Sequence, residues 1–173
     1  SEWFWAKILH VIREDEEVYT FIKEKFESLG ITTGKEFVHF GLTSQDINNT
    51  ATPLSLKNAI HDVYFPVFQD LVSRLDSLSN EWSSIPILAR THGQPASPTR
   101  LGKEIKVFAE RLEIQFKQLK SFGFPAKFGG ATGNFNAHHV AYPGIDWIAF
   151  ADRFVNETLG LQRSKTTTQI EHY

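Results

Sequence analysis

The run from Arg90 to Ala96, Arg-Thr-His-Gly-Gln-Pro-Ala, gathers the side chains of this chain best suited to chemistry. His92 is the one side chain in the run whose ordinary pKa lets it give or take a proton near neutral pH. Gly93 permits an unusual φ, and Pro95 restricts the exit from the turn. We interpret the run as a polar loop that presents a proton-transfer group. The alternative is an ordinary interhelical loop with a surface histidine.

A second glycine-rich segment spans residues 123–144 and is long for a structureless linker. Its Gly129–Gly133 stretch resembles a phosphate-binding loop. No strand is expected before it and no Gly-Lys-Ser/Thr follows, which excludes a Walker-type nucleotide site and leaves a backbone nest for an anion. The alternative for Asn134 and Asn136 is that their side chains satisfy backbone groups of a turn.

The histidines do not have the spacing of metal ligands. His138 and His139 are adjacent and would face apart on a helix, and His172 beside Glu171 is an equally poor match. We therefore expect no metal site. The absence of cysteine excludes disulfides, cysteine-ligated zinc and thiol nucleophiles, and it favours a reducing compartment.

Composition narrows the class of partner. The net charge of -2 provides no electrostatic case for binding nucleic acid or an anionic membrane. No stretch reaches the roughly 18 apolar residues of a membrane span, and the N-terminus lacks a signal-peptide pattern. We expect a soluble, cytoplasmic protein.

The elements that must position these loops are predicted to be helices. Apolar residues recur at helical spacing over about residues 3–29, 44–82, 98–122 and 145–159, and the acidic run Glu14–Glu17 could divide the first of these in two. Gly30 fits a helix C-cap, and Pro53 and Pro66 should bend or break the second helix. The segment Phe37–Phe40 is too short to found a sheet. The prediction is an all-α architecture of long packed helices.

Polar segments interrupt these helices at residues 41–49, 89–99 and 129–139, and a fourth closes the chain at 164–172. Loops at alternate ends of antiparallel helices meet only if other segments or other subunits bring them together. The pattern therefore favours an oligomer with composite sites. The alternative for the first segment is a simple helix start, with Ser44 as the N-cap.

Five elements of the chain resemble those of the adenylosuccinate lyases of bacterial type, within the fumarase/aspartase superfamily. They cover residues 41–49, 88–96, 102–104, 130–138 and 167–171, and they occur in the family's order and at its spacing over roughly residues 17–173. The Thr-His-Gly-Gln-Pro form of the second element favours this branch over the fumarase and argininosuccinate lyase branches.

The resemblance implies a β-elimination that releases fumarate, from adenylosuccinate to give AMP and from SAICAR to give AICAR. His92 would be the general acid that protonates the departing nitrogen. The residues implied in substrate binding are Thr43, Ser44 and Gln169, with Thr91, Gln94, Asn134 and Asn136 lining the site or orienting His92. No metal or organic cofactor is expected, because carboxylate binding can stabilise the carbanion-like intermediate electrostatically.

The resemblance also implies an incomplete long-helix bundle from a homotetramer with shared active sites. Residues 1–42 would end an N-terminal helical domain, residues 43–173 would begin the central bundle domain, and a C-terminal domain would be absent. The serine-rich loop that supplies the family's catalytic base has no counterpart here. The family's Asn-His-Asp element is replaced by residues 12–17, and His10 does not fill its role.

We therefore expect a lyase fragment that is inactive alone and associates or aggregates when isolated, because its long apolar stripes need partner helices. The alternative is an inactive paralogue that works as a helical assembly piece.

Overall fold

The computed structural model of the chain describes residues 22, 24–33, 37 and 40–170. Most of the helix expected over residues 3–29 lies outside this part, as do the acidic run and the segment 12–17. The described end of that helix stops where expected, since Gly30 has a φ of 64° and Ile31 N donates to Phe26 O at 3.0 Å. A glycine in this left-handed conformation is a common helix terminator.

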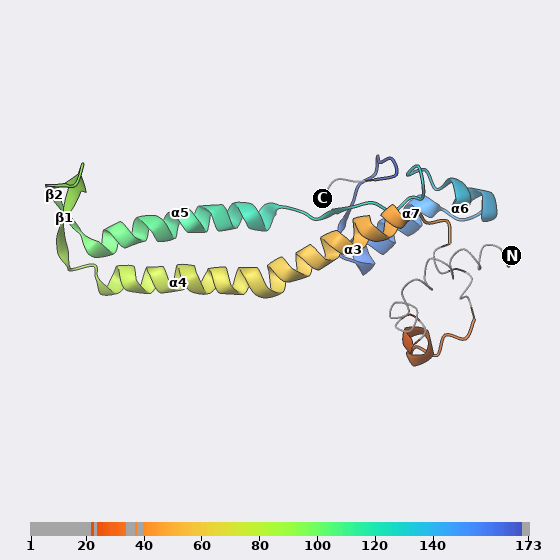
Figure 1. The fold of residues 1–173 in the computed structure, drawn as a ribbon, viewed down its shortest axis with the longest axis horizontal. Helices are drawn as coiled ribbons and strands as arrows, with labels where there is room; N and C mark the ends of the chain where they lie inside the picture. The colour runs from red at the N-terminus through yellow and green to blue at the C-terminus, as the bar shows by residue number, and fades with distance from the viewer. Residues whose placement is uncertain (1–21, 23, 34–36, 38–39, 171–173) are drawn as a thin grey trace.

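The helix expected over residues 44–82 is confirmed as three consecutive helical segments. These are α3 (Ser44–Ala59), the π-helical segment η2 (Ile60–Tyr64) and α4 (Phe65–Glu81). Pro53 lies buried inside α3, and Pro66 lies in the first turn of α4, directly after η2, so neither proline stands at a break in the helix. The helix therefore continues through both prolines, and Figure 1 shows it changing direction between α3 and α4.

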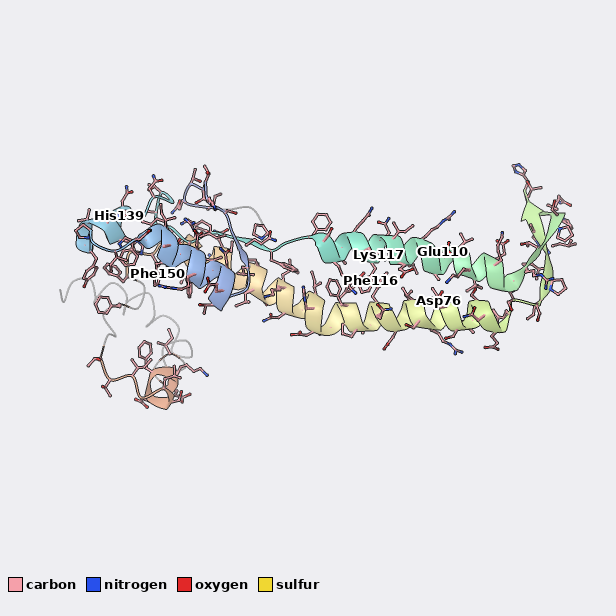
Figure 2. All side chains as sticks on the ribbon, turned by 180° about the vertical axis from the view of Figure 1, so that it is seen from behind. Asp76, Glu110, Phe116, Lys117, His139 and Phe150 are labelled. Atoms are coloured by element: carbon pink, nitrogen blue, oxygen red, sulfur yellow. The ribbon has the colours of Figure 1, made fainter. Side chains whose placement is uncertain are left out.

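Helix α5 (Leu101–Ser121) runs back along α4, and the two form a long antiparallel pair (Figure 1). Phe116 is buried between them, with its ring centroid 5.3 Å from that of Phe65 and 4.8 Å from that of Phe68 (Figure 2). At the other end of the pair Ser79 Oγ donates to Gly102 O at 2.8 Å. Phe108, from the same predicted apolar stripe as Phe116, is exposed, so the pair leaves part of that stripe uncovered.

The segment between α4 and α5 corrects the expectation of a loop without strands. Strands β1 (Pro86–Thr91) and β2 (Gln94–Arg100) pair as an antiparallel hairpin, so Pro98 and Thr99 belong to a strand and do not begin the helix. The turn consists of His92 and Gly93, whose φ angles of 48° and 78° are both positive. Two-residue turns of this kind match the twist of paired strands, which explains why the polar run closes a hairpin.

The opposite end of the molecule is a compact unit of short elements. It contains β3 (Pro125–Ala126), α6 (Asn136–Ala141), α7 (Trp147–Asp152), the π-helical η3 (Arg153–Thr158) and β4 (Gln162–Arg163). Strands β3 and β4 pair in parallel. Two small apolar clusters form its core: Ala126, Val155 and Leu161; and Phe135, Trp147 and Ala151.

Segments α7 and η3 confirm the predicted last helix, and the chain is helix-rich as expected. Among the described helices, none is long and apolar enough to cross a membrane.

Candidate active site

The start of α3 brings two predicted site residues together. Gln169 Nε2 donates to Thr43 Oγ1 at 3.4 Å, across 126 positions of sequence. Thr43 is half-buried, while Ser44 and Gln169 are exposed. Three predicted substrate-binding residues therefore share one accessible corner. The N-cap is Thr43, not Ser44, because Thr43 has extended backbone angles and Ser44 already lies in the helix.

The glycine-rich loop packs directly on this helix start. Gly129 N and Gly130 N donate to the carboxylate of Asp46, at 2.8 Å to Oδ1 and 3.1 Å to Oδ2 respectively. The nest expected at Gly129–Gly133 is thus filled by the protein's own carboxylate. Lys127 Nζ lies 2.8 Å from Asp46 Oδ1, and both side chains are fully buried. The loop is held to α3 by a buried ion pair, and the N–H groups of Gly129 and Gly130 both donate to the carboxylate of that pair.

The loop also lies against the segment that carries Gln169. A Cβ at Gly133, whose φ is 77°, would stand 2.6 Å from Thr167 O, so only glycine fits between them. Asn134 follows directly and Asn136 begins α6, with both side chains exposed. Both asparagines therefore lie at the same end of the molecule as Thr43 and Gln169.

His138 is a buried neighbour that the sequence did not single out as a site residue. It is 1% exposed, and its ring packs 5.5 Å from Phe40 and 4.8 Å from Trp147, measured between ring centroids. Its Nδ1 has no hydrogen-bond partner among the described residues. Burial lowers the pKa of His138, and the nearby carboxylate of Asp46 partly opposes this. His138 is therefore a neutral ring packed beside Gly41, two residues before Thr43.

Sequence reasoning also missed Asp46 and Lys127. The signal for Asp46 is its place three residues after the N-cap Thr43, where a side chain can reach back to the N-cap backbone; Asp46 Oδ2 accepts from Thr43 N at 2.8 Å. Lys127 stands alone between apolar residues, a position from which a lysine needs a buried partner.

His92 lies at the other end of the molecule, at the tip of the hairpin (Figure 1). It is exposed, as are Thr91 and Gln94 on either side, and Arg90 Nη1 donates to Gly93 O at 3.1 Å. A non-glycine residue at a φ of 48° is strained, and such strain is concentrated at functional positions.

The two groups of predicted site residues cannot meet within one chain. The continuous helix from Ser44 to Glu81 separates them by roughly 55 Å at about 1.5 Å of rise per residue. The structure brings Thr43, Ser44, Gln169, Asn134 and Asn136 to one end, and it places Thr91, His92 and Gln94 at the other.

The part of the chain that the structure describes contains no cluster of side chains suited to bind a metal ion. No group of three or more His, Cys, Asp or Glu side chains converges there. The polar groups at the α3 end are hydroxyl and amide groups, which donate and accept hydrogen bonds.

Comparison with curated proteins gives several similar relatives. The adenylosuccinate lyase of Dictyostelium discoideum is 53% identical over 158 residues, which are 88% of this chain and 34% of that protein. The adenylosuccinate lyase of Vibrio cholerae is 45% identical and that of Escherichia coli 43% identical, each over 152 residues, or 87% of this chain and 33% of the relative. The chain thus spans about a third of the length of the curated relatives it matches.

Solved structures support the fold. The 3-carboxy-cis,cis-muconate lactonizing enzyme of Pseudomonas putida matches 76% of this chain and 29% of its own with a TM-score of 0.65 at 24% identity. The β-carboxy-cis,cis-muconate cycloisomerase of Acinetobacter calcoaceticus matches 88% of this chain and 33% of its own with a TM-score of 0.66 at 21% identity.

A family model described as lyase matches residues 8–171. Together with the identities above, this confirms the resemblance drawn from the five sequence elements. The chain belongs to the lyase family, within the fumarase/aspartase superfamily.

Proposed function

We propose that the protein containing this chain is an adenylosuccinate lyase, which eliminates fumarate from adenylosuccinate to give AMP and from SAICAR to give AICAR. The observation that carries the proposal is the contact between Thr43 and Gln169. These two residues were assigned to one site from the family resemblance, and they lie within hydrogen-bond distance although 126 positions separate them.

The α3 end would bind the substrate. Thr43 and Ser44 lie at a helix N-terminus, where their hydroxyl groups and the helix dipole favour a bound carboxylate. The amides of Gln169, Asn134 and Asn136 provide further donors around it. Such donors stabilise the carbanion-like intermediate as charge moves onto the succinyl carboxylate, so the elimination needs no metal or organic cofactor.

The hairpin end would supply the acid. His92 protonates the departing nitrogen, while Thr91 and Gln94 orient its ring or line the site. Because this end lies far from Thr43, a complete site requires the hairpin of another subunit. We therefore propose a homo-oligomer, a tetramer by analogy with the family, whose sites are shared between subunits. We propose that it acts in the cytoplasm. The base that removes the succinyl proton would come from the family's serine-rich loop, which has no counterpart in this sequence.

The domain division follows the same analogy. Residues 1–42 would end an N-terminal helical domain, and residues 43–173 would begin the central bundle domain.

Activity of the full-length protein on adenylosuccinate, followed by ultraviolet absorbance, tests the proposal. His92→Ala should lower kcat by about 10²–10⁴-fold, the usual contribution of a general acid. His61→Ala is the matched control, because His61 lies on η2 between the two ends and packs on Phe65. A His92 variant with undiminished turnover would remove the assigned role. A wild-type protein without activity would favour the inactive assembly piece instead.

Mixing two inactive variants tests the shared site. Subunits that carry His92→Ala combined with subunits that carry Thr43→Ala should restore about a quarter of the sites, since each site would draw these residues from different chains. No recovery after subunit exchange would show that one chain supplies both residues.

A further inference from the structure

The ion pair between Asp46 and Lys127 is the most fully built feature that the proposed chemistry does not use. Both side chains are 0% exposed, and the nitrogen–oxygen distance is 2.8 Å. Among ion pairs of the described residues, the others all leave at least one partner more than a third exposed. Burying two charges is costly unless hydrogen bonds complete the arrangement.

The carboxylate of Asp46 accepts hydrogen bonds from the backbone of two segments that are far apart in sequence, the start of α3 and the glycine loop. Oδ1 accepts from Gly129 N at 2.8 Å and from Lys127 Nζ, while Oδ2 accepts from Thr43 N at 2.8 Å and from Gly130 N at 3.1 Å. We call these five residues the Asp46 cluster. One side chain thus joins the N-cap of α3 to the glycine loop.

Lys127 extends this connection. Its Nζ also donates to Gly130 O, and its backbone N–H donates to Asn49 O, one turn further along α3, at 3.2 Å. The glycine loop is therefore held to α3 at two levels. Because Gly133 packs on Thr167, the loop in turn supports the segment that ends at Gln169.

We propose that Asp46 and Lys127 are positioning residues for the elimination, which fix Thr43 and the glycine loop in their substrate-binding arrangement before substrate arrives. The proposal rests on the proposed function, because it takes Thr43 to contact the substrate. Neither side chain touches substrate itself, since both are fully buried. Holding the donors in advance removes the cost of ordering them on binding, so the cluster acts on affinity for the substrate.

Substituting Asp46 separates positioning from simple charge burial. Asp46→Asn places an NH2 group where one oxygen accepted from Thr43 N or Gly129 N, so two donors face each other, and it removes the counter-charge of Lys127. Adding Lys127→Met removes the buried charge and keeps the donor conflict at the N-cap. The double variant should regain stability without regaining the correct position of Thr43.

Steady-state kinetics on adenylosuccinate and thermal melting of the full-length protein provide the test. Asp46→Asn should lower the melting temperature and raise KM. The double variant should recover most of the melting temperature, yet keep KM at least about tenfold above the wild type. Asp76→Asn is the matched control: Asp76 pairs with Lys106 over the same 2.8 Å on the exposed surface, so both quantities should be unchanged.

A double variant with wild-type KM and melting temperature would overturn the proposal. If neither variant folds, hydrogen exchange of the wild-type protein decides. The peptides that contain Thr43 and Gly129–Gly130 should be protected in the protein without any ligand, and unprotected amides there would overturn the proposal. A wild-type protein that folds but does not cleave adenylosuccinate would instead contradict the proposed function.

Discussion

Gly102→Ala is predicted to disable the proposed acid from a distance. Gly102 lies where α5 leaves the hairpin and touches α4: its N–H donates to Trp82 O at 3.1 Å and its carbonyl accepts from Ser79 Oγ. A Cβ at this position would stand 2.7 Å from Ser83 N and 2.8 Å from Ser83 Cα, and nearer still to Ser79 O. These are backbone atoms, which cannot rotate away as a side chain can.

The displacement can be worked out from this geometry. Restoring ordinary contact requires the helices to separate by roughly 1 Å at Gly102. Because Phe116 holds the other end of the pair, about 20 Å away at about 1.5 Å of rise per residue, α5 and the hairpin tilt by about 3°. The strands reach about 20 Å beyond Gly102 at roughly 3.3 Å per residue, so the tip carrying His92 moves by about 2 Å. Overpacking costs about 1–3 kcal/mol and the weakened Ser79 hydrogen bond about 1 kcal/mol, while the helix propensity of alanine returns up to about 1 kcal/mol. The net loss of stability is about 2 kcal/mol.

Activity should fall by more than this loss of stability suggests. Misplacing a catalytic group by about 1 Å can cost about 10²-fold, so kcat should drop by at least that factor while KM changes little. Steady-state kinetics and melting of the full-length protein measure both effects. Gly144→Ala is the control, because a Cβ there meets nothing within 4 Å. A folded Gly102→Ala protein with kcat within about twofold of the wild type would show that the displacement at Gly102 does not reach His92.

Two further predictions concern the opposite end of the molecule. Gly133→Ala should raise KM, because the alanine has to adopt a φ of 77° and its Cβ would press against Thr167 O, which displaces the segment that carries Gln169. Steady-state kinetics measure this effect, with Gly144→Ala as the control, and an unchanged KM would contradict the prediction. Burial lowers the pKa of His138 in the folded protein below the ordinary value of about 6.5 that it has in the unfolded chain. The free energy of unfolding should therefore fall as the pH drops below about 6.5, because the unfolded chain binds a proton there before the folded protein does. Melting temperatures across this range should show a shallower slope for His138→Asn, and equal slopes would exclude His138 as the cause.

The helical architecture could be predicted because apolar spacing records it locally. Residues 44–82 and 101–121 repeat apolar side chains at helical spacing, and both segments are helical. The hairpin at residues 86–100 was missed because its sequence is rich in proline and polar residues, which normally indicate a loop. Its pairing depends on the positive φ of His92 and on cross-strand hydrogen bonds, and neither has a periodic signature.

Some residues of the candidate site could be predicted from the sequence, and others could not. The resemblance to a family named Thr43, Gln169 and His92 because their residue types stand in recognisable motifs. Asp46 and Lys127 carried weaker signals, a capping position and a charge between apolar residues, and both residue types are ordinary on a surface. Only burial makes them exceptional, and burial is a property of the packed chain.

Residue type and near-neighbour spacing are therefore enough to indicate which side chains could do chemistry and which segments form helices. The tertiary structure decided which of those side chains meet. It joined Thr43 to Gln169 across 126 positions and sent His92 to the far end of a helix roughly 55 Å long. The reason is that a helix is rigid along its axis. Its length fixes the distance between its ends whatever chemistry those ends carry.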